Sequence, residues 1–163
     1  MSEDKISQEY HRLHSLGFFN GKSCLQHSSS IKEIIKNTNS STILDFGSGK
    51  GKQYILDKLD LFWGVKVHCY DPYVKEYENL PNERFDGVIC TDVLEHIPED
   101  DIDSIFEKIK LRANKFIFLG ICTRFAKKNF SDGRNVHLTV KPIDWWKNKL
   151  HANGIILKIE ESK

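Results

Sequence analysis

The sequence predicts one α/β domain with a parallel β-sheet and helices on both faces. Short apolar runs typical of buried strands alternate along the chain with stretches whose apolar residues recur at helical spacing. One run, Ile43 to Phe46, ends in glycines at every second position, Gly47, Gly49 and Gly51, which indicates a strand, a tight turn and a helix start. At 163 residues, the chain has the length of one domain with its own core.

The expected elements follow from apolar spacing and from the residues that bound each run. Ser30 to Glu33 has the form of a capping box, and isoleucines follow it at helical spacing. Pro142 suits a first helical position, and Gly154 suits a helix end. We therefore expect strands at about 43–46, 65–70, 85–91, 115–119 and 155–159, and helices at about 30–37, 50–59, 100–109 and 142–153.

The glycines between the first strand and its helix predict a ligand site. Glycine accepts backbone angles that side chains resist and lets a ligand approach the main chain closely. We expect the free N–H groups at the helix start to face that ligand. The spacing is G-x-G-x-G and not the dinucleotide G-x-G-x-x-G, and Asp45 would repel a pyrophosphate but attract an ammonium group.

This stretch resembles the first motif, D-x-G-x-G-x-G, of the class I S-adenosylmethionine (SAM)-dependent methyltransferases. The resemblance implies a Rossmann-like methyltransferase sheet and SAM as cofactor, with its methionine end near Asp45 and the glycine loop. The alternative is a glycine turn without a ligand. The strings GKGKQY, YDPY, TDVLEHI and NVHLTVKP are also similar to short methyltransferase-like proteins of bacteria and phages. The cofactor-binding residues expected from this motif are Asp45, Gly47, Ser48, Gly49 and Gly51.

An acidic residue at the end of the second strand would hold the ribose of such a cofactor. Asp71 has this position, and its two oxygens can accept from both ribose hydroxyls. The alternative is a turn-forming aspartate before Pro72. We add Thr91 and Asp92, at the end of the next strand, to the cofactor-binding set.

The chain departs from the family in two places. Residues 72–84 are too few for a helix and a third strand, so we expect that strand to be missing or vestigial. The sequence also stops before the family's usual last strand. The family's acidic third motif, which normally contacts the adenine of SAM, has no clear counterpart in this sequence.

A second cluster of polar residues follows the strand 85–91. Asp92, Glu95 and His96 would share one face of a helical turn, where two carboxylates and an imidazole favour a divalent cation. Magnesium, manganese or zinc suits these ligands, with His137 as a fourth. The element resembles that of small-RNA 2′-O-methyltransferases and ubiquinone-pathway O-methyltransferases, which implies a metal that binds substrate hydroxyls. The alternatives are a structural His-Glu pair, or His96 or His137 as a general base, so the catalytic candidates are His96, His137 and Asp92.

The function expected first is O-methylation of a small hydroxylated molecule or sugar. Methylation of an RNA terminus is second, because the net charge of +1 provides no strongly basic surface. A SAM-binding protein without turnover is a third alternative. The basic loop from Arg124 to Arg134 could hold an anionic substrate, and the alternative is a solvated loop without a ligand.

Residues 1–41 are expected to form a helical arm that either covers the pocket or packs on the surface, with the methyltransferase core at 42–163. No apolar run is long enough to span a membrane, and the N-terminus lacks the pattern of a signal peptide. Four cysteines without C-x-x-C spacing are typical of reduced thiols in a cytoplasmic protein. Because a shortened sheet exposes its edges, we expect either a homodimer or the N-terminal arm to cover them.

Overall fold

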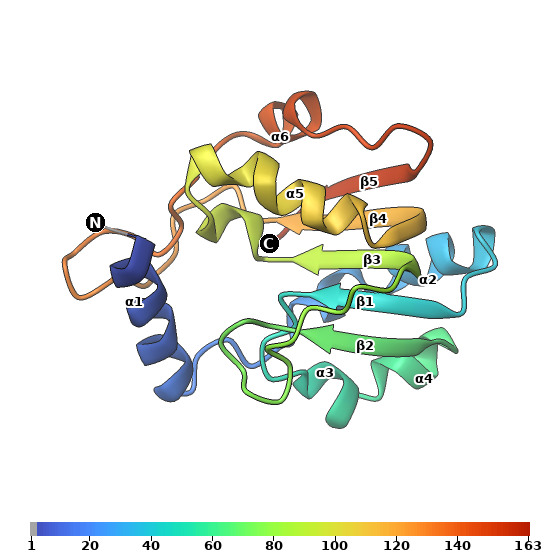
Figure 1. The fold of residues 1–163 in the computed structure, drawn as a ribbon, viewed down its shortest axis with the longest axis horizontal. Coiled ribbons are helices and arrows are strands. Elements are labelled where there is room, and N and C mark those ends of the chain that lie inside the picture. The colour runs from blue at the N-terminus through green and yellow to red at the C-terminus, as the bar shows by residue number, and fades with distance from the viewer. Residues whose placement is uncertain (1–2) are drawn as a thin grey trace.

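Five parallel strands form one sheet in the computed structural model, which describes residues 3–163 (Figure 1). The order across the sheet is β2-β1-β3-β4-β5, and every neighbouring pair is parallel. The first two residues of the expected arm lie outside the described residues. The strands are β1 (Thr42–Phe46), β2 (Lys66–Tyr70), β3 (Phe85–Thr91), β4 (Ala113–Ile121) and β5 (Ile156–Glu161).

The strand order produces a topological switch point between β1 and β3. The chain moves from β1 outward to β2 and then returns to the other side of β1 as β3. Loops that leave two such strands in opposite directions open a crevice at their carboxyl ends, where ligands of open α/β sheets bind. In Figure 1 this edge faces the helix α1 (Glu3–Ser15).

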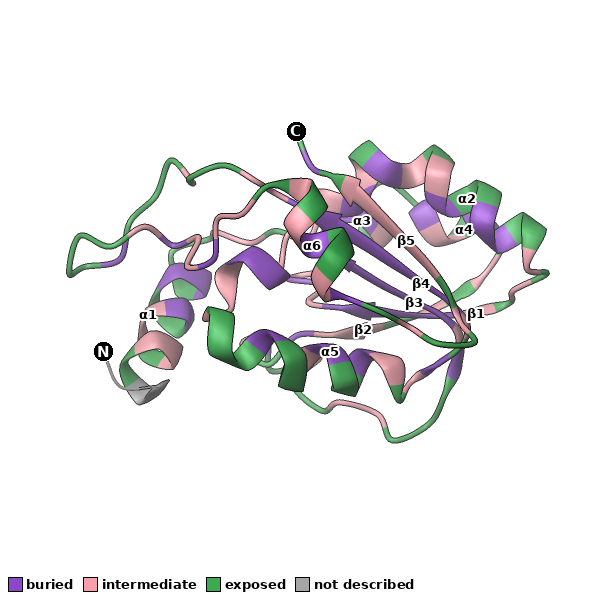
Figure 2. Ribbon diagram, turned by 90° about the horizontal axis from the view of Figure 1, so that it is seen from above, coloured by how far each residue is buried: buried purple, intermediate pink, exposed green. Residues whose placement is uncertain are grey.

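Side-chain alternation along the strands supplies two hydrophobic layers, one for each face of the sheet. Leu119 and its alternate neighbours in β4 pack with α5 (Ile102–Lys110) and α6 (Ile143–Lys149). Phe118 packs on the opposite face with α2 (Ser28–Asn37) and α4 (Leu59–Trp63). The predicted helices on both faces of a parallel sheet are therefore confirmed (Figure 2).

Several local predictions need correction. The helix expected over 50–59 is wrong, because Lys58 has a left-handed backbone (φ 52°) that separates α3 (Lys52–Ile55) from α4. The capping box is also wrong: α2 begins at Ser28, and no side chain caps it. The missing third strand is confirmed, since the described residues 72–84 contain no strand. The other short helical elements are the 3-10 turns η1 (Ser23–His27), η2 (Leu94–His96) and η3 (Glu99–Asp101).

The helix α1 lies beside the carboxyl edge of the sheet, against the loop that follows β4 (Figure 1). Tyr10 and Leu13 of the helix form a buried apolar cluster with Phe130 and Val136 of that loop. Glu9 adds a polar contact, because it accepts hydrogen bonds from the backbone N–H and the hydroxyl of Ser131. The N-terminal segment thus closes one side of the space beyond the strand ends.

Across residues 3–163, the helices are too short or too polar to cross a lipid bilayer.

Candidate active site

A cavity of about 730 Å³ lies at the carboxyl edge of the sheet. The loops after β1, β2, β3 and β4 each contribute to its wall, and α1 and the segment after it cover it from the side. The cavity therefore coincides with the switch point between β1 and β3.

The loop after β1 is held by hydrogen bonds from its backbone to the end of β2. Gly47 and Ser48 both donate their N–H groups to the carbonyl oxygen of Tyr70, at 2.8 and 2.9 Å. Gly47 has φ 87°, and a Cβ atom there would lie 2.3 Å from Cγ2 of Val93. Neither the backbone angle nor the available space admits a side chain. Gly47 and Gly49 line the cavity, as their predicted role requires.

The N–H groups at the start of α3 do not face the cavity. Lys50, Lys52 and Gln53 donate them to the carbonyl oxygens of residues 19, 20 and 21, at 3.2, 3.2 and 2.9 Å. The prediction that these groups are free for a ligand is therefore wrong. We call residues 19–21 the strap: it crosses the glycine loop so closely that a Cβ atom on Gly21 would lie 2.2 Å from the carbonyl oxygen of Ser48.

Asp45 lies beneath the glycine loop and not on the cavity wall. Its Oδ2 accepts hydrogen bonds from Gln53 Nε2 and the Tyr54 hydroxyl, both at 2.8 Å. Burial raises the pKa of Asp45 to about 7, although these two hydrogen bonds oppose that shift. Asp45 therefore connects the end of β1 to α3, while Ser48 and Gly51 also lie away from the cavity wall.

Asp71 and Thr91 do line the cavity, at the ends of β2 and β3. Oδ2 of Asp71 accepts the N–H of Gly49, and Oδ1 accepts the N–H of Tyr73, each at 2.9 Å. Thr91 Oγ1 lies 2.7 Å from the hydroxyl of Ser23. Both predicted cofactor contacts therefore lie in the same cavity as Gly47 and Gly49.

The polar cluster after β3 is not one helical turn. Asp92 has a left-handed backbone (φ 54°), and the turn η2 begins only at Leu94, so the prediction of a shared helical face is wrong. All four expected members, Asp92, Glu95, His96 and His137, nevertheless line the cavity. One oxygen of Asp92 and one of Glu95 are buried, and neither has a hydrogen-bond partner in the part of the chain that the structure describes.

The two histidines lie together but have different surroundings. Their ring centroids are 4.7 Å apart, with the rings perpendicular. Nδ1 of His96 donates to the carbonyl oxygen of Val136 at 3.0 Å, and burial together with His137 lowers the pKa of His96 to about 3. Nδ1 of His137 lies 2.6 Å from the carbonyl oxygen of Arg124. His96 is thus a neutral imidazole, although both rings are only half-buried.

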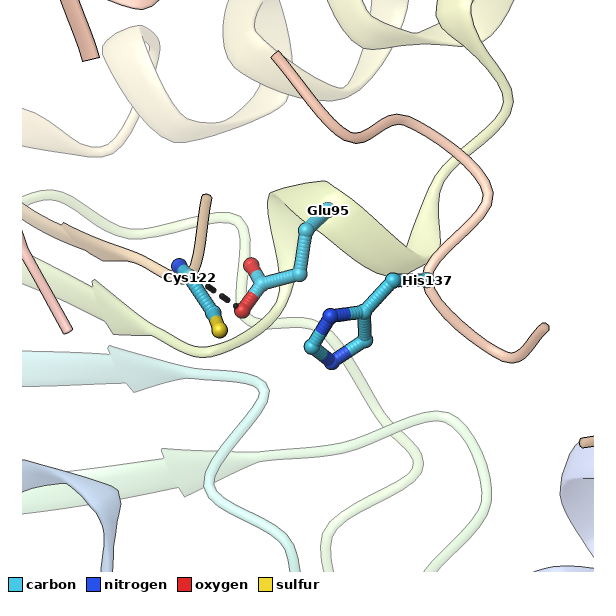
Figure 3. Close-up of side chains that lie close together, drawn as sticks. All are labelled: Glu95, Cys122 and His137. Atoms are coloured by element: carbon cyan, nitrogen blue, oxygen red, sulfur yellow. Dashed lines mark hydrogen bonds between the residues drawn. The ribbon is translucent and has the colours of Figure 1, made fainter. Parts of the chain in front are cut away.

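A different trio has its ligand atoms close together. Among the described residues, one ligand atom each from Glu95, Cys122 and His137 lie within 4.8 Å of one another (Figure 3). Asp92 and His96 are not part of this group. Two of the four expected metal ligands, Glu95 and His137, therefore lie close to Cys122, which the sequence did not indicate as a ligand.

Several basic side chains line the cavity. Arg124, Lys127 and Lys128 come from the loop after β4, as expected, and Lys128 also lies 3.5 Å from the ring centroid of Phe18. Lys22, Lys108 and Lys163 add three more cations that were not anticipated. This region can bind an anionic group.

Sequence reasoning missed three contributors to the site. Tyr10 donates to the carbonyl oxygens of His96 and Val136 at 3.0 Å, which places α1 over the second cluster. Phe19 belongs to the strap and lines the cavity. Cys122 could have been found, because it directly follows β4 and parallel strands end at one common edge.

Comparison with known proteins gives one result. A family model described as a methyltransferase domain matches residues 26–115, more than half of the chain. No curated protein and no solved structure matches the chain. The matched span contains the glycine loop, Asp71 and the residues from Asp92 to His96, but not Cys122 or His137.

Proposed function

The chain belongs to the class I SAM-dependent methyltransferases, and from this we propose that it methylates a hydroxyl group of a small molecule or sugar. The observation that carries the proposal is that one cavity is lined both by residues expected to bind the cofactor and by residues expected to act on the acceptor. Gly47, Gly49 and Asp71 form one side, and Glu95 and His137 form another. SAM supplies an electrophilic methyl group on a sulfonium ion, and a deprotonated hydroxyl is a suitable acceptor.

The residues expected to hold SAM fit that role by their geometry. Gly47 and Gly49 have positive φ angles, which favour glycine over other residues. The loop therefore carries no side chain where these two residues line the cavity. Asp71 already accepts one N–H on each oxygen, and each oxygen keeps a further lone pair for a ribose hydroxyl. Thr91 and Asp92, at the end of β3, line the same cavity.

The acceptor hydroxyl must lose its proton as the methyl group transfers. His137 is the better base, because burial disfavours the protonated form of His96 and lowers its pKa to about 3. A divalent cation bound by Glu95 and His137 is the second route, since a metal lowers the pKa of a bound hydroxyl. On either route, replacing His137 by alanine should lower kcat by about a hundredfold or more.

The basic side chains support an acceptor that also carries a phosphate or carboxylate. Arg124, Lys127 and Lys128 line the cavity beside His137 in the fold, so they could bind the anionic end while the hydroxyl faces His137. The same cations would suit the terminal phosphate groups of RNA. The net charge of +1 favours the small acceptor, because binding along a nucleic acid needs a larger basic surface.

A methyl-transfer assay tests this function. Labelled SAM is incubated with the protein and a panel of sugars, hydroxylated phosphates and carboxylates, catechols, and an RNA with a 3′-terminal diol. We expect label on a small anionic acceptor. The KM for that acceptor should rise in Lys127→Ala but not in Lys66→Ala, which alters an exposed lysine at the amino end of β2, outside the cavity. Label on RNA alone, or on no hydroxyl compound, would contradict the proposal.

We also propose a cytoplasmic homodimer. The four cysteines are free thiols, which suits a reducing compartment. The strands β2 and β5 are the two edges of the sheet, and a partner chain could cover one of them. Sedimentation at several concentrations tests the dimer, and a monomer at every concentration would contradict it.

A further inference from the structure

Three side chains with different donor atoms converge beside the expected acceptor position. Glu95 comes from the turn after β3, Cys122 directly follows β4, and His137 lies in the segment that returns past the sheet edge (Figure 3). One donor atom of each lies within 4.8 Å of the other two. All three residues line the cavity.

The carboxylate of Glu95 is the strongest indication that this point binds a cation. The side chain is completely buried, and its Oε1 accepts the backbone N–H of Cys122 at 3.0 Å. Its Oε2 has no hydrogen-bond partner among residues 3–163. A buried carboxylate with one unsatisfied oxygen is costly, and a bound cation would remove that cost. Asp92, which also has a buried oxygen without a partner, adds negative charge nearby.

The other two ligands are oriented by one backbone carbonyl. Nδ1 of His137 lies 2.6 Å from the oxygen of Arg124, and the thiol of Cys122 donates to the same oxygen at 3.8 Å. A hydrogen bond from one ring nitrogen to a backbone carbonyl is the usual outer contact of a metal-binding histidine, and it leaves the lone pair on the other nitrogen. Both residues are only half-buried and lie in loops, so small movements can shorten the separations.

The donor set selects among the metals expected from the sequence. Magnesium and manganese prefer oxygen ligands, whereas a thiolate, an imidazole and a carboxylate together suit zinc. Three protein ligands with a fourth position open to a cavity are typical of catalytic zinc. Ligand atoms around zinc are roughly 3.5 Å apart, so the observed separations of up to 4.8 Å need a modest contraction on binding.

We propose that Glu95, Cys122 and His137 bind one zinc ion whose fourth position faces the cavity. The catalytic role of this site rests on the proposed function, because the open position would bind the acceptor hydroxyl. Zinc binding itself does not depend on the proposed function. The cysteine replaces Asp92 and His96 of the expected ligand set, and these two residues then belong to the surroundings of the site.

Metal titration tests the site directly. The protein is stripped with a chelator and titrated with zinc, and separately with cobalt, whose bond to a thiolate gives a charge-transfer absorption band in the near ultraviolet. We expect one zinc per chain, a cobalt–thiolate band in the wild type, and loss of that band with at least tenfold weaker zinc binding in Cys122→Ser. Glu95→Gln should also weaken zinc binding, and Cys69→Ser, which alters another half-buried free thiol, should not.

S-adenosylhomocysteine (SAH) binding, measured on the same samples, separates the two proposals. A wild type that binds SAH but no zinc, or a Cys122→Ser variant that keeps the cobalt–thiolate band, would overturn the zinc site alone. A wild type that binds zinc but not SAH would support the site and contradict the proposed function. Cys122→Ser with normal SAH binding and weaker zinc binding supports both.

Discussion

The backbone N–H of Gly49 donates to Oδ2 of Asp71 at 2.9 Å and so joins the loop after β1 to the end of β2. The two residues are separated by one strand crossover, yet both line the cavity. The carboxylate expected to hold the ribose therefore also fixes the loop expected to hold the methionine end of SAM. A change at one of them should affect both parts of the site.

Replacing Asp71 tests both of these roles. Asp71→Ala removes both the acceptor for Gly49 and the ribose contact, so we expect SAH affinity to fall by at least tenfold and stability to fall by about 1–3 kcal/mol. Asp71→Asn retains one carbonyl oxygen for Gly49 or the ribose, so it should lose less of both. Calorimetric titration with SAH and chemical unfolding measure the two effects. An Asp71→Ala variant with wild-type SAH affinity would contradict the ribose role.

The close contact between the glycine loop and the strap predicts a specific cost at Gly49. A Cβ atom there would lie 2.4 Å from the carbonyl oxygen of Phe19, in addition to the strain of φ 54°. We expect Gly49→Ala to destabilise the protein by more than the ~1–2 kcal/mol that a left-handed backbone costs a side chain. Gly154→Ala is the matched control, since Gly154 also has a positive φ (76°) but nothing lies within 4 Å of its added Cβ. Chemical unfolding measures both variants. Equal losses of unfolding free energy would mean that contact with the strap adds no cost at Gly49.

Asp45 should make the protein less stable as the pH rises. Its folded pKa is about 7, against a reference of 3.8, so between these values the folded chain keeps a proton that the unfolded chain releases. Folding stability should fall by up to about 1.4 kcal/mol per pH unit in this window. Asp45→Asn retains an oxygen for Gln53 and Tyr54 and cannot ionise, so it should flatten this dependence and stabilise the protein at pH 8.

Asp86 provides a control with the opposite sign. Hydrogen bonds from the backbone of Ser41 and from Lys115 lower the pKa of Asp86 to about 2, and its contribution to stability is lost only as the pH falls toward that value. Asp86→Asn should therefore destabilise the protein at neutral pH, where Asp45→Asn should not. Chemical unfolding at pH 5 and pH 8 measures both variants. If the unfolding free energy of Asp45→Asn falls with pH as steeply as that of the wild type, another group causes the dependence.

Tyr10 should connect the N-terminal helix to the second cluster. Tyr10→Phe removes a hydroxyl that donates to the carbonyls of His96 and Val136, which we expect to cost about 1 kcal/mol. Because α1 covers the cavity, SAH should also dissociate faster. Stopped-flow displacement of SAH measures that rate, with Tyr77→Phe, outside this cavity, as the control. An unchanged rate would assign Tyr10 to stability alone.

The sequence predicts the sheet well because each strand is a local pattern. The apolar residues 43–46 and the glycines behind them define β1 and its loop without help from the rest of the chain. The helix after that loop was predicted too long, because no local signal marks the left-handed Lys58. The short connection after Asp71 correctly indicated a missing strand, because chain length alone excludes a crossover there.

The site was predictable where chain position fixes it and not where distant segments meet. Gly47, Gly49 and Asp71 follow strands, so their place at the sheet edge could be inferred. The hydrogen bonds from the start of α3 to the strap join residues about thirty positions apart, and nothing in either stretch indicates the other. The position of Cys122 against Glu95 likewise depends on how β3 and β4 pair.

The central claim is that the cavity binds SAM, and thermal unfolding with SAH tests it most directly. At about a hundred times its dissociation constant, SAH should stabilise the wild type by roughly 2.7 kcal/mol, and Asp71→Ala should respond much less. NADH should give no stabilisation at the same concentration. Stabilisation by SAH that Asp71→Ala weakens is the predicted result; no response to SAH or SAM at millimolar concentrations would contradict the account.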